Sequence, residues 1–431
     1  MVSLRGAPTR DGQWPAFQIA RQARRRCVLL AHQPGAPSAQ HATKLSPLAS
    51  PLFFVEANYT GAGASAERLI LSVLESFGVS RASVPEGARL VWANCFEAKL
   101  WASAGHCFIN HFPRSVELSH KHRLCATLRL QRCLPRSFVL PKERFEFLQA
   151  ASPGTHWIVK PGRGGGGRGV QVFQRGASPE AEEELLESIG TSCPAVVSQY
   201  VEKPLLVEGK KVDLRLYVLV TSFGQAGQAA EAGTCQAYLF NEGLVRFASE
   251  AFTMSAAQLG NPCVHLTNNE VNAKHAKQNG PGQANCGNWR LSKLLKWLKD
   301  STAFAPDNVE ALWPRIRALV WEVLEAARPT IAQAVAQLPV TDRCFELFGF
   351  DVLVDDALRP WLCEVNSLPS LGIGGAADLE VDRAMLLNLF EILWKDISAS
   401  TVGDGEALQV ERFESLGAGE TTAADCAEKG A

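Results

Sequence analysis

Regular alternation of charged and apolar residues predicts a strand near the middle of the chain. Between residues 209 and 220, Lys211, Asp213 and Arg215 occupy every second position, and valine and leucine fill the positions between them. Side chains two residues apart point to the same face of a strand, so the three charges share one face. A buried charge without a partner is costly, which makes such a face unfavourable unless it lines a site. The pattern therefore predicts a strand with one face in the core and the other in a binding site.

Two further apolar runs, residues 348–354 and 361–365, each contain a single acid. The short polar segment between them is typical of a turn and predicts an antiparallel hairpin. Pairing would bring Asp351 next to Glu364 and Asn366, which share a face because they are two residues apart. Two carboxylates and an amide oxygen are ligands that Mg²⁺ prefers, although the acids of a hairpin can also simply face solvent. We favour the magnesium site because both acids interrupt apolar runs.

A run of glycine and arginine, residues 162–169, separates two other predicted strands. Glycine permits positive φ and close approach of the backbone, so N–H groups in such a run can cover phosphates. The P-loop and dinucleotide-binding fingerprints are both absent. A flexible linker is the alternative interpretation. The strands on either side favour a phosphate-binding flap, with Lys160 as a point charge at its start.

Helical spacing of apolar residues predicts most of the remaining elements. These helices are expected over residues 66–74, 120–132, 181–189, 291–298, 311–337 and 379–397. A polar, glycine-rich loop is expected over residues 274–288.

Composition is that of an ordinary globular protein of 431 residues, with 46% apolar residues, 20% charged residues and a net charge of −1. This near-neutral charge balance indicates that nucleic acid is not a partner. The twelve cysteines form no C-x-x-C pair, which indicates reduced thiols in the cytoplasm rather than a disulfide framework. No apolar run reaches the roughly 18–20 residues that a membrane span needs, so no membrane association is expected.

Both ends of the chain differ from the middle. The first fifty residues are rich in arginine and contain a single acid, Asp11. A disordered basic extension is favoured there over a transit peptide or a wrongly assigned start, because no amphipathic pattern is sustained. The tail from residue 399 is rich in glycine, alanine, threonine and acids, and is predicted to be disordered.

Several motifs, taken together and in order, resemble one family of enzymes. They are NHFPRSVEL, WIVKP with the glycine run, KKVDLRLYVLV, HLTN, and FELFGFDVLVDDALRPWLCEVNSLPSL. This series resembles the tubulin-tyrosine-ligase-like family of amino-acid ligases from about residue 108 to 395. The resemblance implies an α+β ATP-grasp fold with a glycine-rich phosphate flap and an antiparallel metal-binding sheet. It also implies ATP and Mg²⁺ as cofactors and, in the polyglutamylase branch, transfer of glutamate to glutamate side chains of tubulin tails through an acyl phosphate.

The same resemblance implies roles for individual residues. Lys211 and Arg215 correspond to catalytic residues, and Asp351, Glu364 and Asn366 to metal ligands. Arg246, Asn288 and Leu368 correspond to the pocket for the incoming amino acid. The nucleotide would contact Lys160, Gly166, Gly167, Ser198, Gln199, Tyr200, Val201, Lys211, Val212, Asp213, Thr267 and Asn268.

Domain boundaries follow from the same comparison. The resemblance implies an N-terminal domain over residues 51–141, a central ATP-grasp subdomain over 142–200 and a C-terminal one over 201–398. The basic extension is residues 1–50 and the acidic tail residues 399–431.

Two departures leave the donor amino acid open. Asn288 stands where polyglutamylases usually carry a lysine, and Leu368 stands where the family usually has serine. A sister ligase that transfers glycine or tyrosine, or a non-catalytic tubulin-binding member, therefore remains an alternative. The expected location is the cytoplasmic microtubule cytoskeleton, including axonemes and basal bodies of cilia or flagella.

A basic cluster after residue 113 is expected to contact an acidic partner such as the tubulin tail, with a solvated helix face as the alternative. Its members are Arg114, Lys121, His122, Arg123, Arg129 and Arg132.

Overall fold

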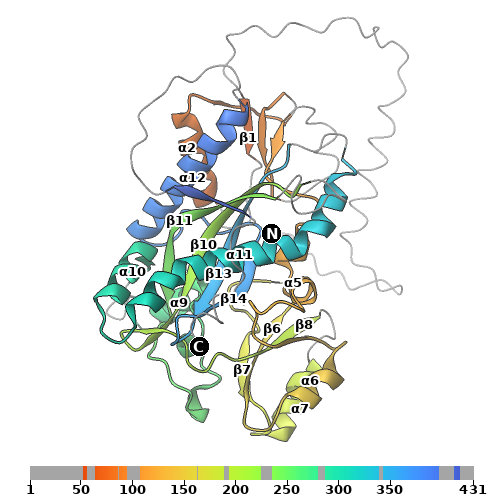
Figure 1. Ribbon diagram of the computed structural model, residues 1–431, viewed down its shortest axis with the longest axis vertical. Helices are drawn as coiled ribbons and strands as arrows, with labels where there is room; N and C mark the ends of the chain where they lie inside the picture. Colours follow the sequence, from red (N-terminus) through yellow and green to blue (C-terminus); the bar gives the residue numbers. More distant parts are fainter. Residues whose placement is uncertain are drawn as a thin grey trace, which may run out of the picture. The chain divides into compact units, whose positions relative to one another are not determined.

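The computed structural model describes ten stretches of the chain (Figure 1). They are residues 52–55, 64–85, 87–94, 107–162, 164–188, 194–224, 235–279, 287–338, 343–397 and 412–417. The predicted basic extension lies outside the described residues, as does most of the predicted acidic tail.

A large antiparallel sheet is built around β10, in the strand order β12-β11-β10-β13-β14. β9 also pairs with β10, and β15 with β11. Both strands of the predicted hairpin and the alternating strand are confirmed. The seven strands are β9 (Leu206–Val207), β10 (Lys210–Ser222), β11 (Gln236–Phe247), β12 (Trp289–Arg290), β13 (Glu346–Val354), β14 (Pro360–Asn366) and β15 (Phe413–Leu416).

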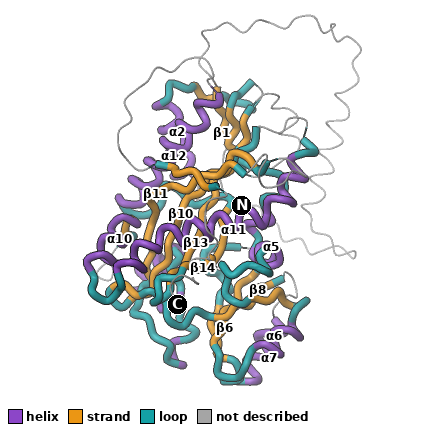
Figure 2. The backbone as a smooth tube through the Cα atoms, in the orientation of Figure 1, coloured by secondary structure: helices purple, strands orange, loops and turns teal. Residues whose placement is uncertain are grey.

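The two faces of this sheet pack against different helices (Figure 2). Val212, Leu214 and Leu216 of β10 share a core with helices α10 (Leu291–Asp300) and α11 (Pro306–Val335). On the opposite face, Tyr217 and Leu219 share a second core with α2 (Ala64–Ser76) and α12 (Ala376–Ile397). The two helices pack on the apolar half of that second face. Its charged half, from Lys211 to Arg215, is the part where a site can form.

Two smaller sheets complete the fold. One has the order β2-β1-β3-β4 and is parallel. The other, β5-β8-β6-β7, is antiparallel. The first comprises β1 (Leu52–Val55), β2 (Ser80–Arg81), β3 (Leu90–Trp92) and β4 (Phe108–Ile109); the second comprises β5 (Ser137–Leu140), β6 (His156–Pro161), β7 (Gln171–Gln174) and β8 (Ala195–Gln199). Mixed helices and largely antiparallel sheets agree with the predicted α+β class.

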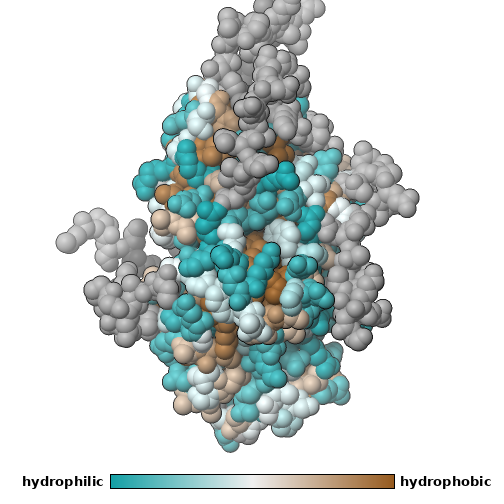
Figure 3. Space-filling view, turned by 60° about the vertical axis from the view of Figure 1, so that its left-hand side comes forward, coloured by the Kyte–Doolittle hydropathy of each residue, from teal (hydrophilic) through white to brown (hydrophobic). Residues whose placement is uncertain are grey.

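Short helices connect or cover these sheets. They are α4 (Val116–Ser119), α5 (Lys121–Thr127), α6 (Arg144–Ala150), α7 (Pro179–Ser188), η1 (Ala256–Gln258), α8 (Pro262–His265) and α9 (Asn269–Asn279). None of the described helices is both long and apolar enough to span a membrane. Figure 3 shows one face of the molecule, on which polar residues predominate and apolar residues form small groups.

The structure differs from the prediction in four places. The helix expected over residues 120–132 ends at Thr127, because β14 binds the chain beyond it: Leu362 N donates to the Cys133 carbonyl. α9 occupies part of the predicted loop 274–288. β5 lies before the predicted boundary at residue 142 yet pairs with β8. β15 forms within the predicted disordered tail, because its backbone completes the edge of the sheet at β11.

Candidate active site

Two adjoining cavities lie where the large sheet meets the small antiparallel sheet. We call them the charged cavity and the apolar cavity. The two share part of their walls, which makes them one continuous candidate site. The shared residues are Lys121, Ile158, Lys160, Lys211, Leu353 and Cys363.

The charged face of β10 forms the floor of the charged cavity. Asp213 pairs in register with Arg246 of β11, and Arg215 with Asp351 of β13. The Arg246 guanidinium donates to both oxygens of Asp213, at 2.7 Å each, and its Nη2 also lies 2.8 Å from Asp351 Oδ2. Arg215 donates to Asp351 through Nε, at 2.6 Å, and through Nη2, at 3.1 Å. Thr267 Oγ1 completes the cluster by donating to Asp213 at 2.6 Å.

This cluster fixes the protonation of its acids. Burial by itself raises the pKa of Asp351, but the guanidinium groups of Arg215 and Arg246 outweigh it and hold that pKa well below its usual range. Asp351 therefore carries a full negative charge at neutral pH. Because Asp351 is already ionised, it can bind a metal ion in place of the two guanidinium groups without first losing a proton.

The predicted hairpin brings the proposed metal ligands together. Asp351 lies opposite Glu364, and Gly349 opposite Asn366, with an irregularity just after Asp351. Asn366 Nδ2 lies 3.4 Å from Glu364 Oε1. The three residues offer hard oxygen donors, which fit Mg²⁺. Within the described residues no group of three or more His, Cys, Asp or Glu is arranged for a metal ion, so the ion would rest on two carboxylates and an amide, and the magnesium site stays a prediction.

Lys121 neutralises the second of these carboxylates. Its Nζ lies 2.7 Å from Glu364 Oε2 and donates to the Gly164 carbonyl at 3.0 Å. The residue was predicted to contact an acidic partner together with the other basic residues of its segment. The structure instead places it in the wall of both cavities.

A chain of hydrogen bonds holds the second lysine of the site. His265 Nε2 lies 3.1 Å from the Gln258 carbonyl, so it carries the proton and leaves Nδ1 as an acceptor. The Tyr200 hydroxyl lies 2.9 Å from that Nδ1 and accepts from Lys211 Nζ at 3.1 Å. Burial and the nearby Lys211 charge lower the pKa of His265 to about 4. A neutral His265 thus orients Tyr200, and Tyr200 orients Lys211.

The glycine run forms a packed loop between β6 and β7. Gly166, Gly167 and Gly169 have φ of +69°, +72° and +70°, a region that side chains rarely adopt. A β-carbon on Gly166 would lie 2.2 Å from a carboxylate oxygen of Glu270. One on Gly167 would lie 3.1 Å from Asn268, Leu266 and Val271 side-chain atoms. The loop is therefore seated on the segment that carries Thr267 and Asn268, which is not the behaviour of a linker.

The walls of the apolar cavity combine aliphatic side chains with a few polar groups. Ile158, Val196, Leu353 and Leu362 line it together with the stretch from Ser198 to Val201. The Ser137 hydroxyl donates to Ser198 Oγ at 2.8 Å. Apolar walls with a few polar groups are typical of small-molecule sites.

The structure brings most of the predicted nucleotide, metal and amino-acid residues to the two cavities. Those in the walls are Lys160, Gly167, Ser198, Gln199, Tyr200, Val201, Lys211, Asp213, Arg246, Thr267, Asn268, Asp351 and Glu364. Arg215 and Asn366 lie behind them, bonded to Asp351 and Glu364.

Four predicted residues lie elsewhere. Val212 packs in the core on the other face of β10, as its place in the alternation requires. Gly166 faces Glu270. Asn288 Nδ2 donates to buried Asp378 at 2.7 Å. Leu368 packs against the second core.

Sequence reasoning missed Arg168, His265 and Cys363, all of which line the charged cavity. Arg168 belongs to the predicted flap and His265 begins the HLTN motif, so both could have been predicted from the motifs. The position of Cys363 beside Glu364 on β14 would have been the signal for this residue. Burial raises the pKa of its thiol.

Comparison with known proteins agrees with this geometry. The model of the tubulin-tyrosine ligase family matches residues 99–401. The chain belongs to this family. The match spans every element of the two cavities, from Lys121 on α5 to Asn366 at the end of β14.

Curated relatives within the family modify tubulin. Human tubulin polyglutamylase TTLL5 is 36% identical over 300 residues, covering 66% of this chain and 22% of that protein. Human tubulin monoglutamylase TTLL4 is 33% identical over 304 residues, covering 67% and 23%. The probable alpha-tubulin polyglutamylase Ttll1 of Tetrahymena thermophila is 28% identical over 331 residues, covering 68% and 74%. The chain thus spans about a fifth of the length of the first two.

Proposed function

We propose that this protein is an ATP-dependent ligase of the ATP-grasp type that adds glutamate to glutamate side chains of tubulin tails. The observation that carries the proposal is the continuous site itself. The apolar cavity adjoins a cavity whose walls hold lysines, a glycine loop and the acidic residues Asp351 and Glu364. A nucleoside triphosphate needs these surroundings in that order: apolar walls for the base, then cations, then metal ligands.

Each part of the nucleotide has a counterpart among the residues. The base would lie between Ile158 and Leu353, against the stretch from Ser198 to Val201. Lys160 and Lys211 stand at the junction of the cavities, where the phosphates would begin. The loop from Gly164 to Gly169 would cover the phosphates with backbone N–H groups.

Mg²⁺ would be held by Asp351, Glu364 and Asn366. When bound, the ion neutralises the charge of the phosphates. The cations that pair with the two carboxylates in the structure, Arg215, Arg246 and Lys121, would then be released toward the substrates. Arg215 would stabilise the oxyanions of the acyl phosphate and of the tetrahedral state.

The chemistry requires an activated carboxyl group, because a carboxylate does not lose oxide to an amine. Transfer of the terminal phosphoryl group of ATP to the acceptor carboxylate gives an acyl phosphate and ADP. The donor amine then attacks the acyl carbon, phosphate leaves, and an isopeptide bond forms. The residues of the charged cavity bind and orient these anionic groups without forming a covalent bond themselves.

A second candidate is the transfer of glycine or tyrosine. Asn288 carries no charge, and its amide is bonded to the carboxylate of Asp378. A donor with a second carboxylate would meet an acidic residue at this point, whereas glycine and tyrosine have none. The names of the curated relatives support glutamate and a location on the microtubule cytoskeleton. Within that cytoskeleton, we propose cilia or flagella.

Incorporation of labelled amino acids into purified tubulin tests the proposal. Wild type and Glu364→Gln are compared with ATP and glutamate, glycine or tyrosine. The expected result is ATP-dependent incorporation of glutamate by the wild type and none by the folded variant, since the variant replaces one carboxylate of the magnesium site by an amide. Incorporation of only glycine or tyrosine would support the second candidate. Tubulin binding with no incorporation of any amino acid would indicate a non-catalytic member.

A further inference from the structure

One cation of the charged cavity is not used by the fold. Lys121 is paired with Glu364, Lys211 donates to Tyr200 and to the His265 carbonyl, and Arg246 is shared by Asp213 and Asp351. Lys160 donates to the Cys363 carbonyl at 3.4 Å. Arg168 also lines the cavity, and within the described parts of the chain its guanidinium has no hydrogen-bond or ion-pair partner.

The backbone that carries Arg168 is nevertheless held on both sides. Val170 N donates to the Gly167 carbonyl at 3.3 Å, which closes a turn around Arg168 and Gly169. The positive φ of Gly169 is typical of the third position of a type II turn. Within the turn, a β-carbon on Gly167 would contact Asn268 and Val271, and one on Gly169 would contact Pro161. The fold therefore fixes the backbone from which the free guanidinium of Arg168 extends.

The position of Arg168 separates it from the other four cations. It is exposed, whereas Lys211 and Arg246 are buried and Lys121 and Lys160 are half-buried. The buried and half-buried cations reach a nucleotide enclosed by the two cavities. A side chain of a macromolecule has to arrive from solvent, and the first cation that it meets is the exposed one on the loop.

We propose that Arg168 binds the acceptor side-chain carboxylate and positions it for phosphoryl transfer. The assignment rests on the proposed function. A guanidinium can hold both oxygens of a carboxylate in one plane, so it would fix the acceptor group at the mouth of the cavity and neutralise its charge. It would also favour an acceptor that ends in a carboxylate over one that ends in an amide.

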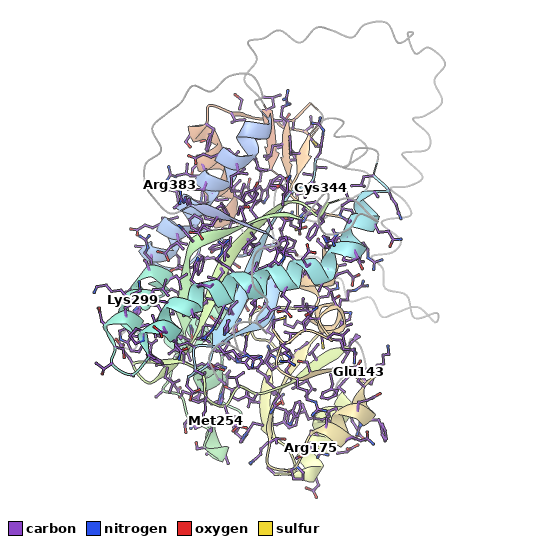
Figure 4. All side chains as sticks on the ribbon, viewed as in Figure 1. Glu143, Arg175, Met254, Lys299, Cys344 and Arg383 are labelled. Carbon is purple, nitrogen blue, oxygen red and sulfur yellow. The ribbon has the colours of Figure 1, made fainter. Side chains whose placement is uncertain are left out.

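Binding measurements test this assignment separately from catalysis. The probes are a fluorescent non-hydrolysable ATP analogue and a fluorescent peptide of glutamate residues, with a glutamine peptide for comparison. The proteins are the full chain as wild type, Arg168→Gln, Arg168→Lys and Arg383→Gln. Arg383 is an exposed arginine of α12, an element that lines neither cavity, and is labelled in Figure 4.

We expect Arg168→Gln to weaken binding of the glutamate peptide about tenfold or more, as the loss of a charge-assisted hydrogen bond does. Its affinity for the ATP analogue and for the glutamine peptide should stay within twofold of wild type, which also shows that the variant is folded. Arg168→Lys should recover part of the loss, and Arg383→Gln should match the wild type. With tubulin as acceptor, Arg168→Gln should raise the KM for tubulin and leave the KM for ATP unchanged.

Two results would overturn the assignment. A parallel loss of affinity for the ATP analogue would place Arg168 on the phosphates instead, and unchanged binding of both probes would give it no ligand. A wild type that binds the glutamate peptide through Arg168 but transfers no amino acid would refute the proposed function and leave the carboxylate assignment standing.

Discussion

Lys121 Nζ lies 2.7 Å from Glu364 Oε2, and the same ammonium donates to the Gly164 carbonyl at 3.0 Å. One side chain of α5 thus joins a proposed metal ligand on β14 to the glycine loop after β6. An ion pair of half-buried groups is screened less by salt than a pair on the surface. Because of this contact, we expect Lys121 to act in nucleotide binding rather than in docking of an acidic partner.

Replacement of Lys121 by methionine should therefore weaken binding of Mg·ATP. Methionine keeps the bulk of the side chain but removes the cation that Mg²⁺ would release from Glu364 toward the phosphates, and it removes the hydrogen bond to the loop. We expect the Kd of an ATP analogue to rise about tenfold, measured by calorimetry in the presence of Mg²⁺. Lys142→Met is the control, since Lys142 is exposed and lines neither cavity of the site. A change in the KM for tubulin alone would return Lys121 to the docking surface.

The glycine loop should lose its affinity for phosphate when Gly166 and Gly167 are replaced by valine. Both have positive φ, where a β-carbon costs about 1–2 kcal/mol per residue. The new side chains would also collide with Glu270 and Asn268. The Kd of the ATP analogue should rise about tenfold or more. Gly165→Ala is the matched control, because a β-carbon there meets open space. If the double variant bound the analogue as the wild type does, the loop would have no role in holding phosphate.

His265 should contribute to stability in a pH-dependent way. Its pKa falls to about 4 in the folded protein from an ordinary value of 6.5, so the unfolded chain binds the extra proton more readily between these values. The contribution is complete above pH 6.5 and is lost as the pH falls through about 4. Urea unfolding at pH 7.5 and 4.5 measures it. The stability advantage of wild type over His265→Gln should shrink by about 2 kcal/mol across this range.

The comparison with a variant is needed because Asp382 acts in the opposite direction. Burial raises the pKa of Asp382 to about 6, so that group favours the folded state more as the pH falls toward its unfolded value. Wild type and His265→Gln share the contribution of Asp382. The difference between their free energies of unfolding therefore isolates the contribution of His265. A constant difference across the range would mean that folding leaves the pKa of His265 at its ordinary value.

Local patterns predicted the parts of the site that depend on strand periodicity. Alternation alone placed Lys211, Asp213 and Arg215 on one face, and the turn residues set the register of Asp351 against Glu364. The ion pairs across the sheet were not predictable in this way, because Arg246 lies 33 residues from Asp213 and the sequence does not state which strands are neighbours. The end of α5 was missed for the same reason: the hydrogen bond that stops it comes from Leu362, far along the chain.

The basic residues after α5 do not form a uniform docking surface. Arg129 is paired with Glu143, a buried residue whose other oxygen accepts from Val139 N at 2.8 Å. Arg132 is exposed, and its backbone carbonyl accepts from Arg359 Nη2 at 3.0 Å. Charge reversal at these two positions should therefore have different effects, although both were expected to contact an acidic tail.

Arg129→Glu should destabilise the fold, because it places a second carboxylate beside buried Glu143 and removes the cation that Glu143 needs. The cost of an unpaired buried charge is about 3–5 kcal/mol, which should appear as a clear fall in Tm by calorimetry. Arg132→Glu should leave Tm unchanged and raise the KM for tubulin, with a smaller effect at high salt, where the attraction is screened. The double variant Arg129→Glu with Glu143→Arg restores the pair in reverse and should recover most of the lost stability. An unchanged Tm in Arg129→Glu would mean that Glu143 reaches solvent, and an unchanged KM in Arg132→Glu would remove this segment from the docking surface.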